Sequence, residues 1–443
     1  MSSLVRCLLV TSLASSIVAG AAGAQILPGV GLPSAPIAGA LGNTPGIGPG
    51  LQGLLASPAA RQAVQPSLDS VSGLPDSLAQ SGPATLLDLR RLRLQQLIRT
   101  NRAQLEPDSA GLPIRRGIVV VVDPAADSLA RAVGAGFRIV ADDRDPGLGL
   151  RSVQLAVPAG MSARDGLKRL RRAAPELQAD FDPIFEPAGG ALAPVAAALA
   201  AGGAGTGARI GMIDGGVASH PSLAGARIEQ NGFAGPPQPT GHGTAVASLL
   251  VGSDGPFAGA ARGASLLVAD VYGGNRAAGS ATAVVKALGW LAARRAQVIN
   301  VSLVGPPNAL LARAIDRVQA RGIRIVAAVG NDGPAAPPQY PASYPGVVAV
   351  TGVDAGGRAL IEAGKASHLD FGAPGADMAA ALPGKGYSRV RGTSFAAPLA
   401  AARLMIAGSP EHLAAEARPG KGKVGRGIVC GACRIDPRTV GAR

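Results

Sequence analysis

Apolar runs alternate with helical periodicities along the second half of the chain. The runs are short and rich in Val, Ile and Ala, and they predict strands at 208–214, 264–272, 298–304, 324–330 and 346–354. Between them, apolar residues recur every three or four positions and predict helices at 241–252, 282–295 and 308–322. Strands that alternate with helices in this way predict an α/β domain with a mostly parallel sheet and right-handed crossovers.

A smaller pattern precedes this domain, over residues 113–187. It predicts a strand at 117–122, a helix at 126–133, strands at 137–140 and 152–157, and a helix that begins after Ser162. The sequence DDRDPG between the two middle strands is expected to form a turn. Ser162 is followed three residues later by Asp165, a pair typical of a helix N-terminus. The order β-α-β-β-α indicates a small α+β domain.

The first 24 residues have the pattern of a secretory signal peptide. Arg6 precedes an apolar stretch, and the small residues at 22–24 suit a cleavage site. A buried N-terminal helix is the alternative. Removal of this segment would leave Cys430 and Cys433 as the only cysteines. In an oxidising compartment such a pair is expected to form a disulfide, although C-x-x-C also occurs in redox and zinc sites.

Three further segments join these parts. Residues 25–84 are rich in Gly and Pro and carry few charges, which is typical of an irregular segment. Residues 85–112 include a basic helical stretch, expected to pack as an amphipathic helix or, alternatively, to contact a membrane surface. Residues 188–207 are rich in Ala and Gly and carry no charge, so we expect proteolytic cleavage within this linker.

The composition narrows the class of protein further. The 443 residues include 63 Gly and 36 Pro, fewer than in a wholly low-complexity chain or a collagen-like fibre. The internal apolar stretches are shorter than the ~20 residues of a membrane-spanning helix, which excludes a polytopic membrane protein. The net charge of +14 comes from 42 basic and 28 acidic residues. Because no basic run is interleaved with aromatic residues, we expect loose attraction to anionic surfaces and no specific nucleic-acid binding.

Three polar residues stand at positions where α/β enzymes carry their chemistry. Asp214 ends the first expected strand, His242 lies between glycines at a helix start, and Ser394 lies at another helix start. Active-site residues gather at the carboxyl ends of parallel strands. Asp214 and Ser394 each have an ordinary alternative, because an aspartate there can bind a ribose or a metal and a serine commonly caps a helix. Their joint occurrence in the order Asp, His, Ser favours a serine nucleophile activated by a histidine.

The sequence resembles the subtilisin-type, or subtilase, serine proteases. The motifs that carry the resemblance lie in family order within residues 205–430 and are MIDGG, HPSL, GHGTAVAS, VINVSL, AAVGNDG, YPA and GTSFAAP. The resemblance implies a three-layer subtilisin-like fold and a catalytic triad of Asp214, His242 and Ser394. It also implies that the oxyanion-hole amide is Asn331. In such a triad the histidine takes the serine proton and returns it to the leaving amine, while the aspartate orients the ring.

Two positions depart from the family pattern. Gly215 stands where the family has Ser or Thr, so one side-chain hydrogen bond to Asp214 is expected to be missing. Val304 stands where the substrate-binding strand of the family has Gly. Unless it points away, Val304 narrows the pocket for the residue before the scissile bond, and we expect small or aliphatic residues there. The resemblance assigns substrate binding to Ser302, Leu303, Val304, Ala328 and Gly330.

The resemblance further implies that the protein is made as a zymogen. The domain at 113–187 is similar in element order and position to the propeptide of these enzymes, an intramolecular chaperone and inhibitor that leaves after a cut in the linker. A permanent accessory domain is the alternative. We expect a secreted serine endopeptidase acting on peptides or proteins, without a cofactor for its chemistry. Structural calcium occurs in the family, but residues 205–443 contain no Asp-rich loop of ligand spacing.

Two other functions stay open at this stage. The first is a catalytically silent interaction protein on the same fold, for which the glycine after the catalytic aspartate is a hint. The second is a peptide ligase or cyclase, because the same triad can pass an acyl group to an amine instead of water.

Overall fold

The computed structural model describes residues 83–188 and 207–442, without residue 385. The expected signal peptide, nearly all of the Gly/Pro-rich segment and nearly all of the linker lie outside the described residues. Within the described ranges, no helix is both long enough and apolar enough to cross a bilayer.

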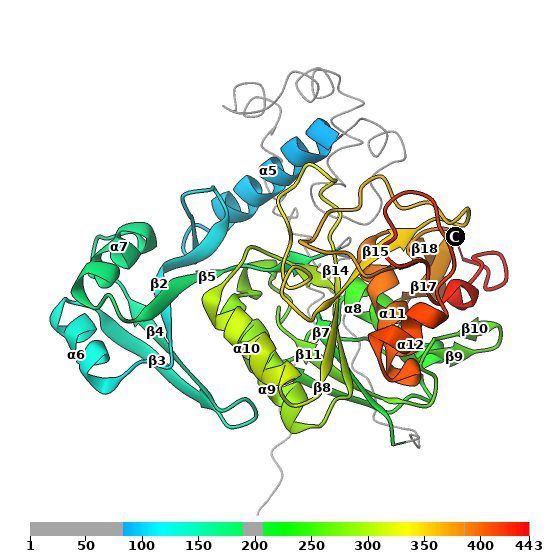
Figure 1. The fold of residues 1–443 in the computed structure, drawn as a ribbon, viewed down its shortest axis with the longest axis horizontal. Helices are drawn as coiled ribbons and strands as arrows, with labels where there is room; N and C mark the ends of the chain where they lie inside the picture. Colours follow the sequence, from blue (N-terminus) through cyan, green and yellow to red (C-terminus); the bar gives the residue numbers. More distant parts are fainter. Residues whose placement is uncertain (1–82, 189–206, 385, 443) are drawn as a thin grey trace, which may run out of the picture. The chain divides into compact units, whose positions relative to one another are not determined.

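A seven-stranded sheet forms the centre of the larger domain (Figure 1). All neighbouring strands in it are parallel, in the order β16-β15-β14-β12-β7-β11-β8. The strand bounds are Arg209–Asp214 for β7, Ile228–Gly232 for β8, Ser265–Asp270 for β11, Val298–Val301 for β12, Arg324–Ala328 for β14, Val348–Val353 for β15 and Phe371–Pro374 for β16. The predicted α/β fold class with a mostly parallel sheet is confirmed.

Helices cover both faces of this sheet. Their bounds are Gly241–Val251 for α8, Ala281–Ala293 for α9, Ala309–Gln319 for α10 and Thr393–Ala407 for α11. Side chains of β7 alternate between the faces, because Ile210 and Met212 belong to one apolar cluster and Ile213 to the other. The first cluster includes α8 and α11, and the second includes α9 and α10. Burial of the sheet on both faces explains why its central strands are mostly apolar.

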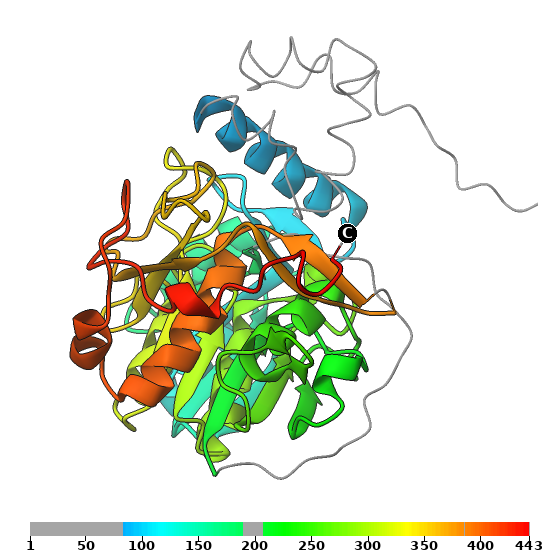
Figure 2. The same cartoon turned by 90° about the vertical axis from the view of Figure 1, so that its right-hand side faces the viewer.

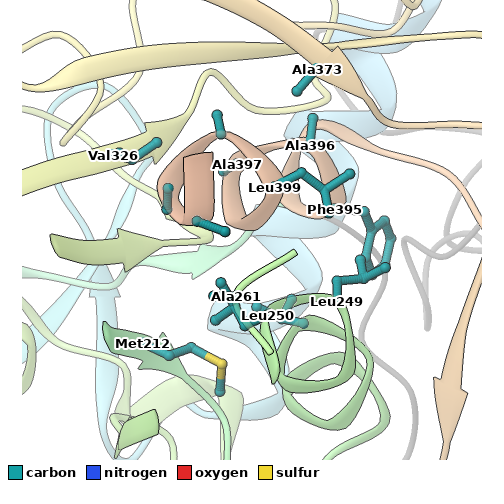
Figure 3. Close-up of a cluster of buried hydrophobic side chains, with 14 of the residues drawn as sticks. Met212, Leu249, Leu250, Ala261, Val326, Ala373, Phe395, Ala396, Ala397 and Leu399 are labelled. Atoms are coloured by element: carbon teal, nitrogen blue, oxygen red, sulfur yellow. The ribbon is translucent and has the colours of Figure 1, made fainter. Parts of the chain in front are cut away.

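Helix α11 is the central helix of the first cluster. It packs against β12, β14 and β15, and Figure 2 shows it crossing this face of the sheet. Figure 3 shows Phe395 of α11 beside Leu249 of α8. Small alanines fill much of α11, which lets the two helices approach each other closely.

Shorter elements complete the larger domain. Their bounds are Glu186–Pro187 for β6, Pro221–Leu223 for η1, Ser253–Asp254 for β9, Phe257–Ala258 for β10, Arg276–Ala278 for η2, Leu303–Val304 for β13, Met378–Leu382 for β17, Gly386–Val390 for β18, Pro410–Ala415 for α12 and Gly431–Cys433 for η3. Strand β6 pairs with β13, and β17 pairs with β18. Cys430 and Cys433 are joined by a disulfide at η3.

The smaller domain is an antiparallel sheet with three helices. Its elements are α5 (Pro83–Thr100), β1 (Leu105–Pro107), β2 (Pro113–Val122), α6 (Ala126–Gly134), β3 (Arg138–Asp145), β4 (Leu150–Ala156), α7 (Ala163–Ala173) and β5 (Gln178–Pro183). The central strand β2 alternates between two cores. Val119 and Val121 pack under α6 and α7, whereas Val120 and Val122 belong to the cluster of α9 and α10. The sheet is therefore apolar on both faces, and one face packs on the larger domain.

Two local expectations for this domain were wrong, and one further strand is present. The acidic residues expected to form a turn instead pair with β4, so strand β3 continues to Asp145. The turn therefore follows Asp145. Strand β5 was not expected at all. The basic helix expected over 85–112 ends at Thr100, because the chain turns there and β1 pairs with β2. The Ser162 cap is confirmed, since its side chain accepts from the N–H of Asp165.

Strand β5 carries two carboxylates that bind helix N-termini of the larger domain. Oδ2 of Asp180 accepts from the N–H of Ala309 at 2.9 Å, in the first turn of α10. Oδ1 of Asp182 accepts from the N–H of Thr282 at 3.0 Å, in the first turn of α9. Acceptors at these positions satisfy backbone donors that a helix cannot satisfy by itself. The smaller domain thus supplies caps for two helices of the larger one.

Candidate active site

Asp214 and His242 form a buried hydrogen-bonded pair at the carboxyl edge of the sheet. Asp214 is the last residue of β7, and His242 is the second residue of α8. Nδ1 of His242 lies 2.9 Å from each carboxylate oxygen of Asp214, and the N–H of Gly215 donates to the same carboxylate at 2.7 Å. Because an ionised carboxylate only accepts, Nδ1 carries the proton and Nε2 is the basic nitrogen of the ring.

Ser394 lies in the first turn of α11, in a geometry that depends on two unusual neighbours. Gly392 has a φ of 142°, a conformation that favours glycine. Pro398 has no N–H to donate to the carbonyl of Ser394 four residues earlier. The hydroxyl of Ser302 donates to that carbonyl instead, at 2.9 Å. Ser302 therefore replaces the missing helical hydrogen bond and helps to fix Ser394.

The reactive atoms of His242 and Ser394 are both buried. Nε2 of His242 and Oγ of Ser394 have no hydrogen-bond partner within the described part of the chain. The ring of His242 lies 5.3 Å, between centroids, from the ring of Phe395, the residue after the serine. A basic nitrogen and a hydroxyl in one dry region are what activation of a nucleophile requires, and their mutual hydrogen bond often tightens only in the substrate complex.

Asn331 approaches the serine from the loop after β14. Its Oδ1 accepts from the N–H of Thr393 at 3.0 Å, which orients the amide, and its Nδ2 donates to the carbonyl oxygen of Ala188. A Cβ added at Gly392 would lie 2.9 Å from Nδ2 and 3.6 Å from Oγ of Ser394. The amide and the hydroxyl therefore lie close together, where a donor can stabilise charge developing on a carbonyl oxygen.

The chain itself lies along this site. Residues 185–188, here called the cleft segment, run antiparallel to β13. The N–H of Ala188 donates to the carbonyl of Ser302 at 2.8 Å, and the N–H of Phe185 donates to the carbonyl of Gly279 at 2.7 Å. The hydroxyl of Tyr272 donates to the carbonyl of Phe185 at 3.1 Å. The cleft segment is thus held by its backbone, the mode in which an extended peptide adds to a strand.

Comparison with known proteins agrees with this geometry. The model of the subtilase family matches residues 205–411. Subtilisin Savinase of Lederbergia lenta is 32% identical over 202 residues, which make up 44% of this chain and 73% of that protein. The chain belongs to the subtilase family. Its relatives in this family are serine endopeptidases, so the predicted family and enzyme class are confirmed.

Other relatives are matched over a smaller share of their length. The alkaline protease of Alkalihalobacillus alcalophilus is also 32% identical over 202 residues, but these cover 52% of it. Fervidolysin from Fervidobacterium pennivorans, a keratinolytic enzyme related to subtilisin, has a TM-score of 0.58 at 21% identity. The likeness covers 72% of this chain and 61% of that one, and it supports the subtilase fold.

The expected specificity residues of this subtilase lie around Ala188. Ala188, Val304 and Ala328 belong to one apolar cluster, and all three side chains are buried. Val304 points toward Gly330, because its Cγ1 lies 3.3 Å from the position that a Cβ of Gly330 would take. Leu303 pairs with Pro187 in the register of β13 and β6. The small side chain of Ala188 is thus buried in the same cluster as Val304 and Ala328.

Some residues of the subtilase site have structural roles that their motifs alone do not assign. Nδ2 of Asn300 donates to the hydroxyl of Ser302 at 2.9 Å, and Oγ1 of Thr393 accepts from the N–H of Gly330 at 3.1 Å. Asn300 is the polar residue of the apolar strand β12, a pattern that could have marked it. Asp332, directly after Asn331, binds two arginines of α5 far away in the sequence.

Proposed function

We propose that the chain is the zymogen of a secreted serine endopeptidase and that its first substrate is its own Ala188–Gly189 bond. The observation that carries the proposal is the hydrogen bond from the Asn331 side chain to the Ala188 carbonyl oxygen. The backbone bond from Ala188 to Ser302 supports the same alignment. Ala188 would then be the residue that donates the acyl group.

The chemistry follows from the positions of the side chains. His242 Nε2 accepts the Ser394 hydroxyl proton as Oγ attacks the carbonyl carbon of Ala188. The negative charge that forms on the Ala188 oxygen is stabilised by Nδ2 of Asn331, and by the backbone N–H of Ser394 as the second donor we expect. The protonated His242 then gives its proton to the amine of Gly189, which leaves. Water then attacks the ester between Ala188 and Ser394. His242 takes the proton of the water and returns it to Oγ of Ser394, which releases Ala188 as a carboxylate.

The smaller domain would act as the propeptide. It holds the cleft segment in the site, packs Val120 and Val122 against α9 and α10, and caps both helices through Asp180 and Asp182. A part that caps helices and fills the cleft both assists folding and blocks other substrates. Export is supported by the signal pattern of the first 24 residues.

The pocket around Ala188 supports a preference for small residues before the scissile bond. Ala188, Val304 and Ala328 lie in one buried apolar cluster, so an aromatic ring in place of the Ala188 methyl group would have to displace its neighbours. We therefore expect the mature enzyme to cut after Ala or a similarly small residue.

The test compares the full chain with its Ser394→Ala variant in an expression host that lacks other proteases. Intact-mass analysis of the wild type should find one fragment that ends at Ala188 and another that begins at Gly189. The Ser394→Ala chain should stay uncut, and a fluorophosphonate probe should label only the wild type. Cutting of the Ser394→Ala chain at this bond would overturn the proposal.

The two alternative functions give different results in the same test. An uncut wild type that the probe does not label would identify a silent scaffold. A mature enzyme that joins peptides instead of hydrolysing them would be seen as product masses larger than those of the substrate. The complete set of Asp214, His242, Ser394 and Asn331 argues for an active enzyme over a silent scaffold, and the product masses decide between hydrolysis and ligation.

A further inference from the structure

One arginine of α5 lies between two buried carboxylates beside the cleft segment. Nη2 of Arg93 lies 3.3 Å from Oε2 of Glu186 and 2.9 Å from Oδ1 of Asp332. Nε of Arg93 also donates to Oε2 of Glu186, at 3.4 Å. The exposed fractions of the three side chains are 13%, 7% and 6%. A planar guanidinium can bind two carboxylates at once in a way that a point charge cannot.

Two further arginines complete this cluster. Nε of Arg90 lies 2.9 Å from Oδ2 of Asp332, and Nη2 of Arg276 lies 3.4 Å from Oε1 of Glu186. Burial opposes ionisation of Asp332, but Arg93 and Arg90 lower its pKa below the ordinary value, so the carboxylate is charged. Buried charges are tolerated only when they are paired, and loss of one partner leaves the other uncompensated.

The two carboxylates belong to the two parts that must be aligned for the cut. Glu186 lies in the cleft segment, two residues before Ala188. Asp332 directly follows Asn331, whose amide binds the Ala188 carbonyl. Arg93 therefore links the acyl side of the scissile bond to the loop that carries the oxyanion donor. Leu86 of the same helix packs over this loop, because it lies 2.9 Å from the Cβ position of Gly333.

We propose that Arg93 is a positioning residue for cleavage of the Ala188–Gly189 bond, which it aligns by bridging Glu186 and Asp332. The proposal rests on the self-cleavage proposed above. Arg93 acts through two carboxylates and touches neither the scissile carbonyl nor the catalytic side chains. It leaves with the N-terminal fragment, so it acts in self-cleavage and has no part in later turnover by the mature enzyme.

The first experiment measures self-cleavage of the full chain after dilution from urea, by mass spectrometry over time. Arg93→Gln should lower the first-order rate constant about tenfold to hundredfold, because a displacement of about 1 Å at the reacting atoms has effects of this size. The rate constant of Arg93→Lys should lie between those of the wild type and Arg93→Gln, because lysine keeps the positive charge but lacks the planar guanidinium that binds two carboxylates. Arg99→Gln is the matched control, an exposed arginine in the last turn of the same helix, and should cut at the wild-type rate.

A second comparison separates positioning from a merely structural role of α5. In a Glu186→Gln/Asp332→Asn background, Arg93 has no carboxylate to bridge, so Arg93→Gln should cause no further slowing. The mature enzyme made from each Arg93 variant has the same chain from Gly189 onward, so its kcat/KM on a small peptide should not change. If Arg93→Gln still slows self-cleavage in the Glu186→Gln/Asp332→Asn background, or if it lowers the kcat/KM of the mature enzyme, the proposed bridging role of Arg93 is wrong.

The failure of this inference differs from failure of the proposed function. If the wild type cuts itself and Arg93→Gln cuts at the same rate, the positioning role is wrong and the protease stands. If the wild type does not cut itself, or the Ser394→Ala chain is cut, the proposed self-cleavage is wrong and the positioning role falls with it.

Discussion

Thr240 occupies the space that a side chain at Gly215 would need. A Cβ added at Gly215 would lie 2.5 Å from Oγ1 and 2.7 Å from Cγ2 of Thr240. Thr240 cannot turn away without loss, because its Oγ1 caps α8 by accepting from the N–H of Gly243 at 3.0 Å. Gly215 and Thr240 are therefore sterically complementary: the absence of a side chain at Gly215 leaves the space that Thr240 fills.

We therefore predict that Gly215→Thr, a change toward the usual family residue, is harmful here. It should lower the free energy of unfolding by about 1–3 kcal/mol, the range for overpacking, and slow self-cleavage. Adding Thr240→Ala should remove part of the steric conflict. The loss in free energy of unfolding of the double variant should then be smaller than the sum of the losses of the two single variants. Denaturant unfolding of the four proteins measures this coupling, and simple additivity would contradict the steric account.

The size of the residue before the scissile bond should control self-cleavage. Ala188→Phe should slow the cut about tenfold or more, because the ring must enter a pocket bounded by Val304. Val304→Gly should restore cutting of the Ala188→Phe chain while changing the Ala188 chain little. The rate constants of the four chains are measured by mass spectrometry. Equal cutting of the Ala and Phe chains by the wild-type pocket would show that Val304 does not limit it.

Gly289→Ala should have opposite effects on the two forms of the protein. A Cβ at Gly289, inside α9, would overlap the carboxylate of Asp145 at the end of β3. That carboxylate cannot easily move, since its Oδ1 accepts from the N–H of Leu148 at 2.9 Å. We expect the uncut Ser394→Ala precursor to be destabilised by about 1–3 kcal/mol. The isolated mature domain should instead gain up to about 1 kcal/mol, because alanine is the better helix former.

The control for this prediction removes the obstacle. Adding Asp145→Ala to the Gly289→Ala precursor should recover the lost stability, as read from thermal unfolding. A precursor that Gly289→Ala stabilises as much as the mature domain would show that the two domains do not meet at this glycine.

His220 should make the protein less stable in mild acid. Its Nδ1 accepts from the N–H of Ser222 at 3.1 Å, and Nε2 lies 3.0 Å from the carbonyl of Gly386, so the ring is neutral. Burial lowers the pKa of His220 below its usual value of 6.5, against smaller opposing effects of Gly386 and Asp254. The unfolded chain therefore takes up a proton first as the pH falls through 6.5, and this favours unfolding.

The measurement is the free energy of unfolding of the Ser394→Ala precursor between pH 7.5 and pH 5. We expect the free energy of unfolding to fall as the pH drops below 6.5, and we assign this loss to His220. His220→Asn keeps an acceptor for Ser222 and should flatten the pH dependence, whereas His412→Gln, at an exposed position, should leave it unchanged. Equal slopes in all three proteins would remove His220 as the cause.

The fold was predictable wherever a strand is buried on both faces. The apolar runs that became β7, β12, β14 and β15 have no other stable place than the middle of a covered sheet. Strand β5 was missed because its sequence, QADFDP, carries two acids. Those acids are explained only by helices α9 and α10, to which Asp180 and Asp182 bind, and no local pattern reports such partners.

The part of the candidate site that stands in local motifs was predictable, and the part that the fold brings together from distant segments was not. Asp214, His242, Asn331 and Ser394 stand in motifs whose glycines are required by the local backbone, as Gly392 is by its φ of 142°. By contrast, Glu186 lies 93 residues after Arg93 in the sequence, and Asp332 lies 239 residues after it. Each is an ordinary charged residue in its own segment, and its role arises only when the chain brings the three together.

The direction of β7 makes the proposed cut difficult to reverse. Asp214 ends this strand at the active site, and Arg209 begins it at the opposite edge of the sheet, about 17 Å away. Residues 189–206 must connect Ala188 to that far edge. Once the bond is cut, the amino group of Gly189 is covalently connected to the larger domain only through the chain that enters at that far edge. Water then meets the acyl group at its bulk concentration while the amine does not, and entropy alone favours hydrolysis over resealing.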